Sequence, residues 1–322
     1  MGRPARRPLG RSGLAVAPLA LGGNVLGWTV DEATGFQILD AFVSAGFNLI
    51  DTADVYSTWV PGHHGGESET IIGKWLFQSG RRKDVLIATK VGNDMGPGGK
   101  GLSAEHISHA AQASLQRLHT DYIDLYQAHD DDPDVPLSET LQAFSSLVDE
   151  GTVRAVGASN YDAERLKTAL RISRERGLHR YESLQPLYNL MDRQEFEGGL
   201  EEVCQREGLG VLTYYSLAAG FLTGKYRSKD DLGKSPRGRR AEPRLSERGF
   251  RILAALDDVA TRLDSSPATV ALAWLMARPS VTAPIASATS LDQLNQLLRA
   301  ADLHLDAEAL RLLDMASAES AC

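Results

Sequence analysis

The chain has 322 residues, of which 43% are hydrophobic and 24% charged, a composition typical of a globular protein and not of a disordered or fibrous one. Lysine and arginine number 34 against 42 aspartates and glutamates, and the net charge of −8 argues against nucleic acid or an anionic membrane as a partner. Cys204 and Cys322 form neither a disulfide framework nor a metal-binding spacing, so we expect a cytoplasmic protein without a metal site. No apolar run reaches the roughly 20 residues of a membrane helix.

The first apolar segment has two interpretations. Arg3, Arg6 and Arg7 stand ahead of the run Leu14–Leu21, as in an export signal. Pro18 and the Gly22-Gly23 pair interrupt that run, and we therefore predict a hairpin followed by a first strand over Ala17–Leu21.

Strand-like runs and amphipathic segments alternate along the rest of the chain, a pattern typical of successive βαβ units. Eight such units without a break in composition predict a (β/α)8 TIM barrel formed by a single domain over residues 1–322, in preference to an open sheet with a second domain. Strands are expected at Ala17–Leu21, Phe47–Ile50, Val85–Thr89, Tyr122–Ala128, Val153–Gly157, Glu182–Leu184, Gly210–Tyr214 and Val281–Ile285. Helices are expected around Phe36–Val43, Ile71–Leu76, Ile107–Leu118, Leu141–Val148, Leu166–Leu170, Leu200–Cys204 and Thr269–Met276.

The segment from Ser216 to Glu247 has no such periodicity and is rich in lysine and arginine. Structureless segments of this length are usually either disordered or functional lids. It is therefore interpreted either as a solvated basic loop or as a flap that closes over phosphate groups.

Polar residues stand where the expected strands end, and the strands of such barrels carry their reactive groups at that end. We expect these side chains to meet at one mouth of the barrel. They are Asp51 with Tyr56 nearby, Lys90, His129, Ser159-Asn160, Gln185, Tyr215-Ser216 and Ser287.

An aspartate, a tyrosine, a lysine and a histidine without a nucleophile or metal are suited to proton delivery during carbonyl reduction. A phenol has a pKa near ~10, and we expect the ammonium of Lys90 to lower the pKa of Tyr56. Asp51 would orient that ammonium, His129 would assist the proton transfer, and the hydride must come from a cofactor. Taken singly, each residue also has a structural explanation, such as a buried ion pair or a core histidine.

These residues lie in stretches that resemble the aldo-keto reductase family over nearly the whole chain. The matching stretches are Leu9–Leu14, Phe47–Tyr56, Ile87–Val91, Leu125–His129, Gly157–Tyr161 and Leu222–Tyr226. The resemblance implies a barrel whose floor is plugged by an N-terminal β-hairpin, extra C-terminal helices, and NAD(P)(H)-dependent reduction of an aldehyde or ketone. It also implies that Asp51, Tyr56, Lys90 and His129 form the catalytic tetrad.

The resemblance further implies a set of cofactor contacts. Ser159, Asn160 and Gln185 would bind the nicotinamide carboxamide, and Tyr215 would stack on its ring. Ser216, Leu217, Gly220, Leu222 and Lys225 match the loop over the pyrophosphate, while Ser287, Thr289 and Gln293 lie in the segment on the adenosine side.

The adenosine-side segment departs from the pattern of many relatives. Ser287 stands where they have glycine, and no arginine stands near Thr289 to grip a 2′-phosphate. Hydroxyls or a nearby base such as Arg299 could serve instead, so NADP(H) is only modestly favoured over NAD(H).

Two other enzyme classes have partial signals. Gly96–Gly101 spells G-x-G-x-x-G. A Rossmann fold requires this motif directly after the first strand, whereas here it follows the third. His63-His64 and His129–Asp132 could be ligands in a metal-dependent hydrolase, although no His-x-His pair is present.

Trp28, Trp59 and the His63-His64 segment are expected to line the substrate pocket, which favours carbonyl compounds with apolar or ring-bearing bodies. The sequence names no particular small-molecule substrate and no oligomeric state. The alternative outside enzymes is a cofactor-sensing auxiliary subunit with the same fold, because some family members serve potassium channels in that role.

Overall fold

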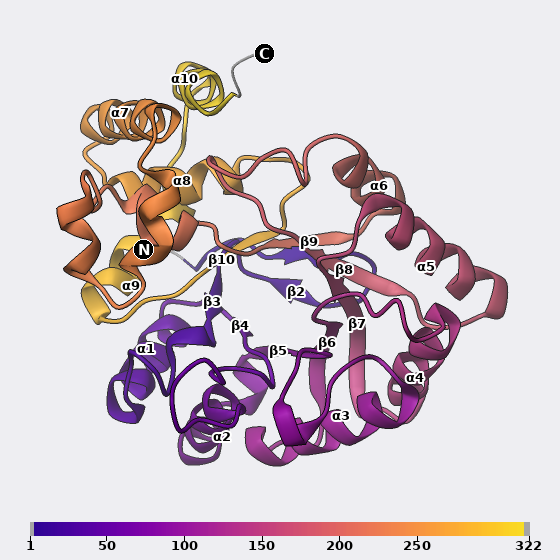
Figure 1. Ribbon diagram of the computed structural model, residues 1–322. Helices are drawn as coiled ribbons and strands as arrows, with labels where there is room; N and C mark the ends of the chain where they lie inside the picture. The colour runs from indigo at the N-terminus through magenta and orange to yellow at the C-terminus, as the bar shows by residue number, and fades with distance from the viewer. Residues whose placement is uncertain (1–2, 319–322) are drawn as a thin grey trace.

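Eight parallel strands form a closed barrel in the computed structural model, which describes residues 3–318 (Figure 1). The barrel confirms the predicted (β/α)8 architecture. Around it the strands run in the order β10, β3, β4, β5, β6, β7, β8 and β9, so sequence neighbours pair directly and β10 closes the ring on β3. Their bounds are β3 Ala20–Gly22, β4 Leu49–Asp51, β5 Leu86–Val91, β6 Ile123–Ala128, β7 Val153–Ser159, β8 Tyr181–Gln185, β9 Gly210–Thr213 and β10 Ala283–Ala286.

Helices surround the barrel because each carries an apolar face that packs on the strands. Polar side chains start several of them: Asp31, Ser103 and Asp162 each accept a hydrogen bond from a backbone N–H three residues ahead. The helices are α1 Glu32–Ser44, α2 Glu67–Ser79, α3 Ala104–Leu118, α4 Leu137–Asp149, α5 Ala163–Arg176, α6 Gly199–Glu207, α8 Pro267–Met276 and α9 Leu291–Leu298. Within the described residues, none is long and apolar enough to cross a bilayer.

Two further helices lie outside this ring, at the upper edge of Figure 1. The C-terminal helix α10 (Ala307–Ser317) packs on α7 (Glu247–Arg262), and α7 in turn packs on α8. Extra C-terminal helices were expected, but α7 was not: it is inserted between β9 and α8. Its apolar face includes Ile252 and Leu256, which are fully buried.

The basic segment between β9 and α7 contains helical turns, so the expectation that it has no regular structure is wrong. Arg227, Lys229 and Lys234 are exposed, as the interpretation of a solvated basic segment expects. The segment forms three short 3₁₀ helices, η4 (Ala218–Thr223), η5 (Lys229–Lys234) and η6 (Gly238–Arg244). Phe221 and Tyr226 are fully buried within it, which fixes its path over the barrel. Other short 3₁₀ turns are η1 Gly23–Val25, η2 Arg82–Asp84, η3 Gly96–Gly98 and η7 Arg299–Ala301.

The N-terminal hairpin pairs β1 (Arg7–Pro8) with β2 (Ala15–Val16). Its apolar residues Leu9, Leu14 and Val16 are buried in one cluster with inward-facing strand residues of the barrel. A Cβ added to Gly210, the first residue of β9, would come within 2.4 Å of the Leu9 side chain. The hairpin therefore closes the amino-terminal end of the barrel, and the opposite end is left for the site.

Truncating Leu9 to alanine removes this contact from a closed apolar cluster. We expect Leu9→Ala to lower the free energy of unfolding by about 3 kcal/mol, because the rigid strand ends cannot collapse into the cavity. Chemical denaturation measures the change, with the half-exposed Leu291→Ala as the control. Equal small losses for both variants would contradict the role of the hairpin as a packed plug.

Candidate active site

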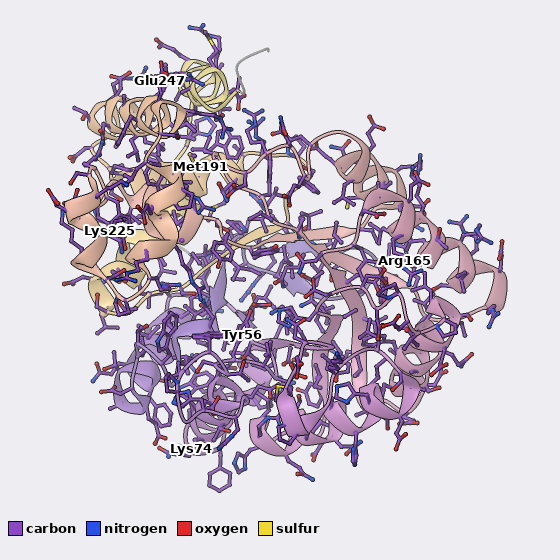
Figure 2. The ribbon with its side chains drawn as sticks, viewed as in Figure 1. Tyr56, Lys74, Arg165, Met191, Lys225 and Glu247 are labelled. Atoms are coloured by element: carbon purple, nitrogen blue, oxygen red, sulfur yellow. The ribbon has the colours of Figure 1, made fainter. Side chains whose placement is uncertain are left out.

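A cavity of about 630 Å³ lies at the carboxyl end of the barrel and contains most of the site residues expected from the sequence. Strand ends supply one wall, since Asp51, His129 and Gln185 end or directly follow β4, β6 and β8. The segment after β9 supplies the other wall. The expected residues on its lining are Asp51, Tyr56, Trp59, His129, Ser159, Asn160, Gln185, Tyr215, Ser216, Leu217, Gly220, Lys225, Ser287 and Gln293. Figure 2 shows Tyr56 near the centre of the barrel and Lys225 on the segment that leads towards α7.

Lys90 lies behind this lining as a fully buried ammonium group. Its Nζ donates to Asp51 Oδ2 at 2.8 Å and to the carbonyl of Thr52 at 2.7 Å. The third contact is with Tyr56 Oη at 3.4 Å. All three N–H directions of the ammonium are thereby used, and the side chain is held in one position beneath the phenol.

The charges of this group differ in part from the expectation. Burial opposes the charged form of Lys90, but Asp51 and then Tyr56 outweigh it, so the pKa of Lys90 is raised. For Tyr56, burial is the largest influence and exceeds the opposing effect of Lys90, so the pKa of the phenol is raised. Lys90 lowers the pKa of Tyr56 as expected, but burial outweighs it, so the expectation of a lowered pKa overall is wrong.

The ring of His129 lies 6.0 Å from that of Tyr56, centroid to centroid. Burial, and then the charge of Lys90, hold the pKa of His129 well below its ordinary value, so the ring is neutral at physiological pH. Its Nδ1 is buried without a hydrogen-bond partner. A proton is therefore better placed on Nε2 than on Nδ1, because a buried donor without an acceptor is costly.

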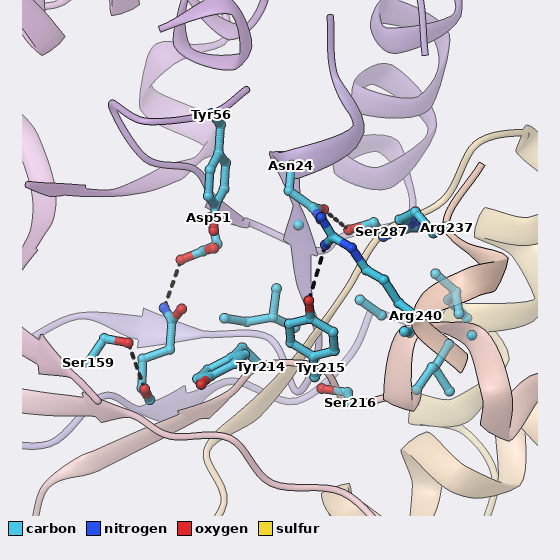
Figure 3. A pocket seen from close by; sticks show the side chains of 18 of the residues that line it. Asn24, Asp51, Tyr56, Ser159, Tyr214, Tyr215, Ser216, Arg237, Arg240 and Ser287 are labelled. Carbon is cyan, nitrogen blue, oxygen red and sulfur yellow. Dashed lines mark hydrogen bonds between the residues drawn. The ribbon is translucent and has the colours of Figure 1, made fainter. Parts of the chain in front are cut away.

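Three expected cofactor ligands are connected to the catalytic group. Gln185 Nε2 donates to Asp51 Oδ1 at 2.9 Å, and Ser159 Oγ donates to the Gln185 carbonyl at 2.9 Å (Figure 3). Asn160 Nδ2 donates to the carbonyl of His129 at 3.0 Å. These contacts orient the amides of Gln185 and Asn160 before any ligand binds.

Several lining residues were missed or not assigned from the sequence: Asn24, Asn93, Asp130, Tyr214, Arg237 and Arg240. Asn93 and Asp130 follow β5 and β6 closely, so the rule about strand ends could have found them. The hydroxyl of Tyr214 donates to Asn160 Oδ1 at 2.7 Å, which makes it a second fixed aromatic ring beside Tyr215.

The two arginines belong to the basic segment and reach across the cavity from it. Arg240 Nη1 donates to the hydroxyl of Tyr215 at 3.2 Å, as Figure 3 shows. The guanidinium carbons of Arg237 and Arg240 each lie 6.0 Å from the ring centre of Trp28. Burial and the neighbouring Arg240 lower the pKa of Arg237, which indicates a local excess of positive charge.

Other expected residues lie away from the lining. Leu222 is buried in the core, Thr289 is bonded to the side chain of Gln293, and Trp28 packs against Trp59 at 5.6 Å. Arg299 does not line the cavity. The arginines that do line it, and that could contact a phosphate group there, are Arg237 and Arg240.

The histidine pair His63-His64 is also absent from the lining, contrary to expectation. His63 Nδ1 instead lies 2.9 Å from the buried Ser57 Oγ. The side chain of Glu67 accepts from the backbone N–H groups of Ser57 and His64, so it ties this loop to the start of α2. The loop carries Trp59 and thus shapes the mouth of the cavity.

Comparison with known proteins decides the family. A profile described as the Aldo/keto reductase family matches residues 18–318. This chain belongs to the aldo/keto reductase family. It is 36% identical to the Bacillus subtilis protein named uncharacterized oxidoreductase YrpG, over 95% of this chain and 94% of that protein. It is also 34% identical to the Escherichia coli protein named Protein tas, with 93% of both chains covered.

Rice has a relative named probable voltage-gated potassium channel subunit beta, which is 33% identical to this aldo/keto reductase over 92% of the chain and 90% of the relative. Family membership makes the chain an oxidoreductase that uses a nicotinamide cofactor. The closed barrel also excludes the Rossmann interpretation, since Gly96–Gly101 leads from β5 into α3. Among the described residues, no group of three histidine, cysteine or acidic side chains is arranged to hold a metal ion. Cys322 lies outside the described residues.

Asp54 is a buried acid beside this site that the expected mechanism does not use. Burial, and then the nearby carboxylate of Glu69, raise the pKa of Asp54 to about 7. Its Oδ1 accepts from the backbone N–H of Val55 at 2.6 Å. Glu69 is itself held by Arg117 and by the hydroxyl of Thr89.

The raised pKa makes stability depend on pH. The unfolded chain loses the Asp54 proton near pH 4 and the folded chain only near pH 7, so stability falls between these values by about 4 kcal/mol. Asp54→Asn keeps the acceptor for Val55 and removes this loss. We expect denaturation curves at pH 8 to show the variant to be more stable than the parent by up to about 4 kcal/mol, with the gain vanishing at pH 4. A gain independent of pH would contradict the assignment.

Proposed function

We propose that the protein reduces an aldehyde or ketone to an alcohol with a nicotinamide cofactor, reversibly, and that Tyr56 is the proton donor. The observation that carries the proposal is the buried Lys90 ammonium 3.4 Å from the Tyr56 hydroxyl in the cavity wall. The bound cofactor supplies the hydride, which no side chain can provide. The side chains of this chain supply orientation and the proton.

Tyr56 holds the proton that the new alcohol needs. Its raised pKa keeps the phenol protonated through neutral pH. The ammonium of Lys90 donates to the phenol oxygen, so the phenol's own hydrogen is left to point elsewhere, towards a carbonyl oxygen in the cavity. When that oxygen gains negative charge and the proton leaves Tyr56, the ammonium stabilises the phenolate at once.

His129 supports the same oxygen from a second side. A neutral ring with its proton on Nε2 donates a hydrogen bond to a carbonyl without adding a charge beside Lys90. Asp51 keeps Lys90 charged and placed, and through Gln185 it also positions the amide that would bind the carboxamide. Tyr214 or Tyr215 would cover the ring of the nicotinamide.

The residues of the cavity fit NADP(H), the cofactor we favour modestly over NAD(H). One end is lined by Lys225, Arg237 and Arg240. Among the described residues, no carboxylate on the cavity lining forms an ion pair with any of these three side chains. Gly220, in the left-handed conformation with φ 88°, brings backbone close to this cationic group. Phosphate groups suit such a wall, because guanidinium groups bind them with two parallel hydrogen bonds. Ser287 and Gln293 would contact the adenosine side.

A regulatory role is the second candidate, because three relatives are named as potassium channel subunits beta. In that case the same cavity would sense the cofactor without steady turnover. Measurable steady-state oxidation of NADPH with simple aldehydes distinguishes the two candidates.

Three broader proposals go with this function. Residues 1–322 form a single domain, the protein acts in the cytoplasm, and its partner is a small carbonyl compound and neither nucleic acid nor a membrane. They are supported by the unbroken succession of βαβ units and by the acidic net charge.

Tyr56→Phe removes only the proton donor. We expect kcat for reduction to fall by about 10²- to 10⁴-fold, with the affinity for the cofactor nearly unchanged. Stopped-flow or steady-state absorbance measures the rate, and fluorescence titration measures cofactor binding. Tyr126→Phe is the matched control, since that phenol is buried on β6 outside the cavity. Full activity of Tyr56→Phe would refute the assignment.

Arg237→Ala and Arg240→Ala test the phosphate end. Loss of one charged hydrogen bond should raise the KM for NADPH by about tenfold or more, with a smaller change in the KM for NADH. Arg299→Ala, outside the cavity, should leave both constants unchanged. If the KM values for NADH and NADPH rise by the same factor, the arginines do not select the 2′-phosphate.

A further inference from the structure

The substrate end of the cavity contains a carboxylate that the proposed mechanism does not use. Asp130 directly follows His129, the residue expected to contact the reacting carbonyl, and both line the cavity. Val55, Trp59 and Asn93 complete this part of the wall, which we call the substrate end. Asn160 connects the two residues, because it bonds to the Asp130 side chain and donates to the carbonyl of His129, so a group attached to a carbonyl compound held by His129 can reach Asp130.

Asp130 differs from the other carboxylate on the lining. Asp51 is neutralised by Lys90 and also accepts from Gln185. Asp130 has no ion pair with any side chain in the described part of the chain, and its neighbours are the uncharged amides of Asn93 and Asn160. Burial raises the pKa of Asp130 above its ordinary value, and no cationic side chain in the described part of the chain compensates the charge of its ionised form.

Positive charge enters the cavity from another part of the wall, although Arg237 and Arg240 also lie 6.0 Å from the ring centre of Trp28, which packs on Trp59. Lys225, Arg237 and Arg240 belong to the segment after β9, whereas Asp130 follows β6, three strands away around the barrel. Arg240 is also held at the hydroxyl of Tyr215. If phosphate groups occupy the basic end, they neutralise the arginines. The negative charge of Asp130 then acts on a bound substrate without an opposing positive charge.

The aromatic rings at the substrate end add to this preference. Trp59 lies edge-on to Tyr56 and to Trp28, with ring centres 5.6 Å apart in both pairs. Trp59 is 38% exposed, so part of its ring is available at the mouth. A cation beside an exposed indole is attracted by the negative face of the ring, whereas a carboxylate is not.

We propose that Asp130 is a specificity-determining residue which makes the enzyme prefer carbonyl substrates that carry an ammonium group and disfavour those that carry a carboxylate. This inference rests on the proposed function, since it concerns the substrate of the same cavity. The discrimination is electrostatic, so it should decrease as ionic strength rises.

The test uses three benzaldehydes: the unsubstituted compound and its para derivatives with a trimethylammoniomethyl or a carboxymethyl group. The methylene spacer reduces the electronic effect of each charged group on the carbonyl, and the comparison of parent with variant cancels the effect that remains. We expect kcat/KM to be highest for the cationic aldehyde and lowest for the anionic one. In Asp130→Asn the ratio of the two should fall by about tenfold.

Asp131→Asn is the matched control. It removes the same charge from the next residue, but Asp131 is paired with Arg165 at 2.8 Å and does not line the cavity. The control should keep the parent's ratio, which separates a local contact from a change in the overall field. Asp130→Ser and thermal melting curves guard against a fold defect in a single variant.

A second measurement does not depend on turnover. Calorimetry of the corresponding benzyl alcohols against the protein with NADPH, a non-reacting combination, should show tighter binding of the cationic alcohol, and Asp130→Asn should remove the difference. If all three aldehydes are reduced and the ratio is the same in parent, Asp130→Asn and Asp131→Asn, this inference is overturned and the proposed function stands. If no aldehyde is reduced, the proposed function fails, and equal binding of the two charged alcohols then overturns the inference as well.

Discussion

The buried ammonium of Lys90 is the constraint on which the rest of the site depends. An ammonium without water must have its three N–H groups and its charge satisfied, and here Asp51, Thr52 and Tyr56 do so. This requirement places β4, β5 and the loop after β4 in one relative position. It also explains why a phenol, a poor acid in a buried setting, lies where its ionised form would be stabilised most.

The same requirement connects the side-chain amide of Gln185 to the group formed by Asp51, Lys90 and Tyr56. Asp51 uses one oxygen for Lys90 and the other for Gln185, and Ser159 holds the backbone of Gln185 in turn. Adjacent strands provide this chain of contacts, because Ser159 and Gln185 are partners in the register of β7 and β8. A carboxamide bound at Gln185 would thus be aligned with Tyr56 through a rigid part of the barrel.

Charge is distributed unevenly around the cavity. The basic end comes from the long segment between β9 and α7, whose buried residues Phe221 and Tyr226 anchor it. The substrate end has Asp130 and Trp59, and Arg237 and Arg240 approach it from the basic segment through the ring of Trp28. A protein with an acidic net charge can therefore have a locally basic wall in its cavity, which the net charge of −8 does not reveal.

The succession of strands and helices follows from the sequence alone, because periodicity marks each element and strand ends mark the site. Asp51, Lys90 and His129 could be placed at one mouth for that reason, and Asn93 and Asp130 follow the same rule. Tertiary structure decided what periodicity cannot express. The packing of Phe221 and Tyr226 orders a segment that has no regular pattern, and α7 lies on the outside of the barrel. Folding also brings Arg237 and Arg240 close to Trp28, which is far from them along the chain. It also decided the charge states, because the pKa of Tyr56 depends on burial as much as on its neighbour, and burial exists only in the folded chain.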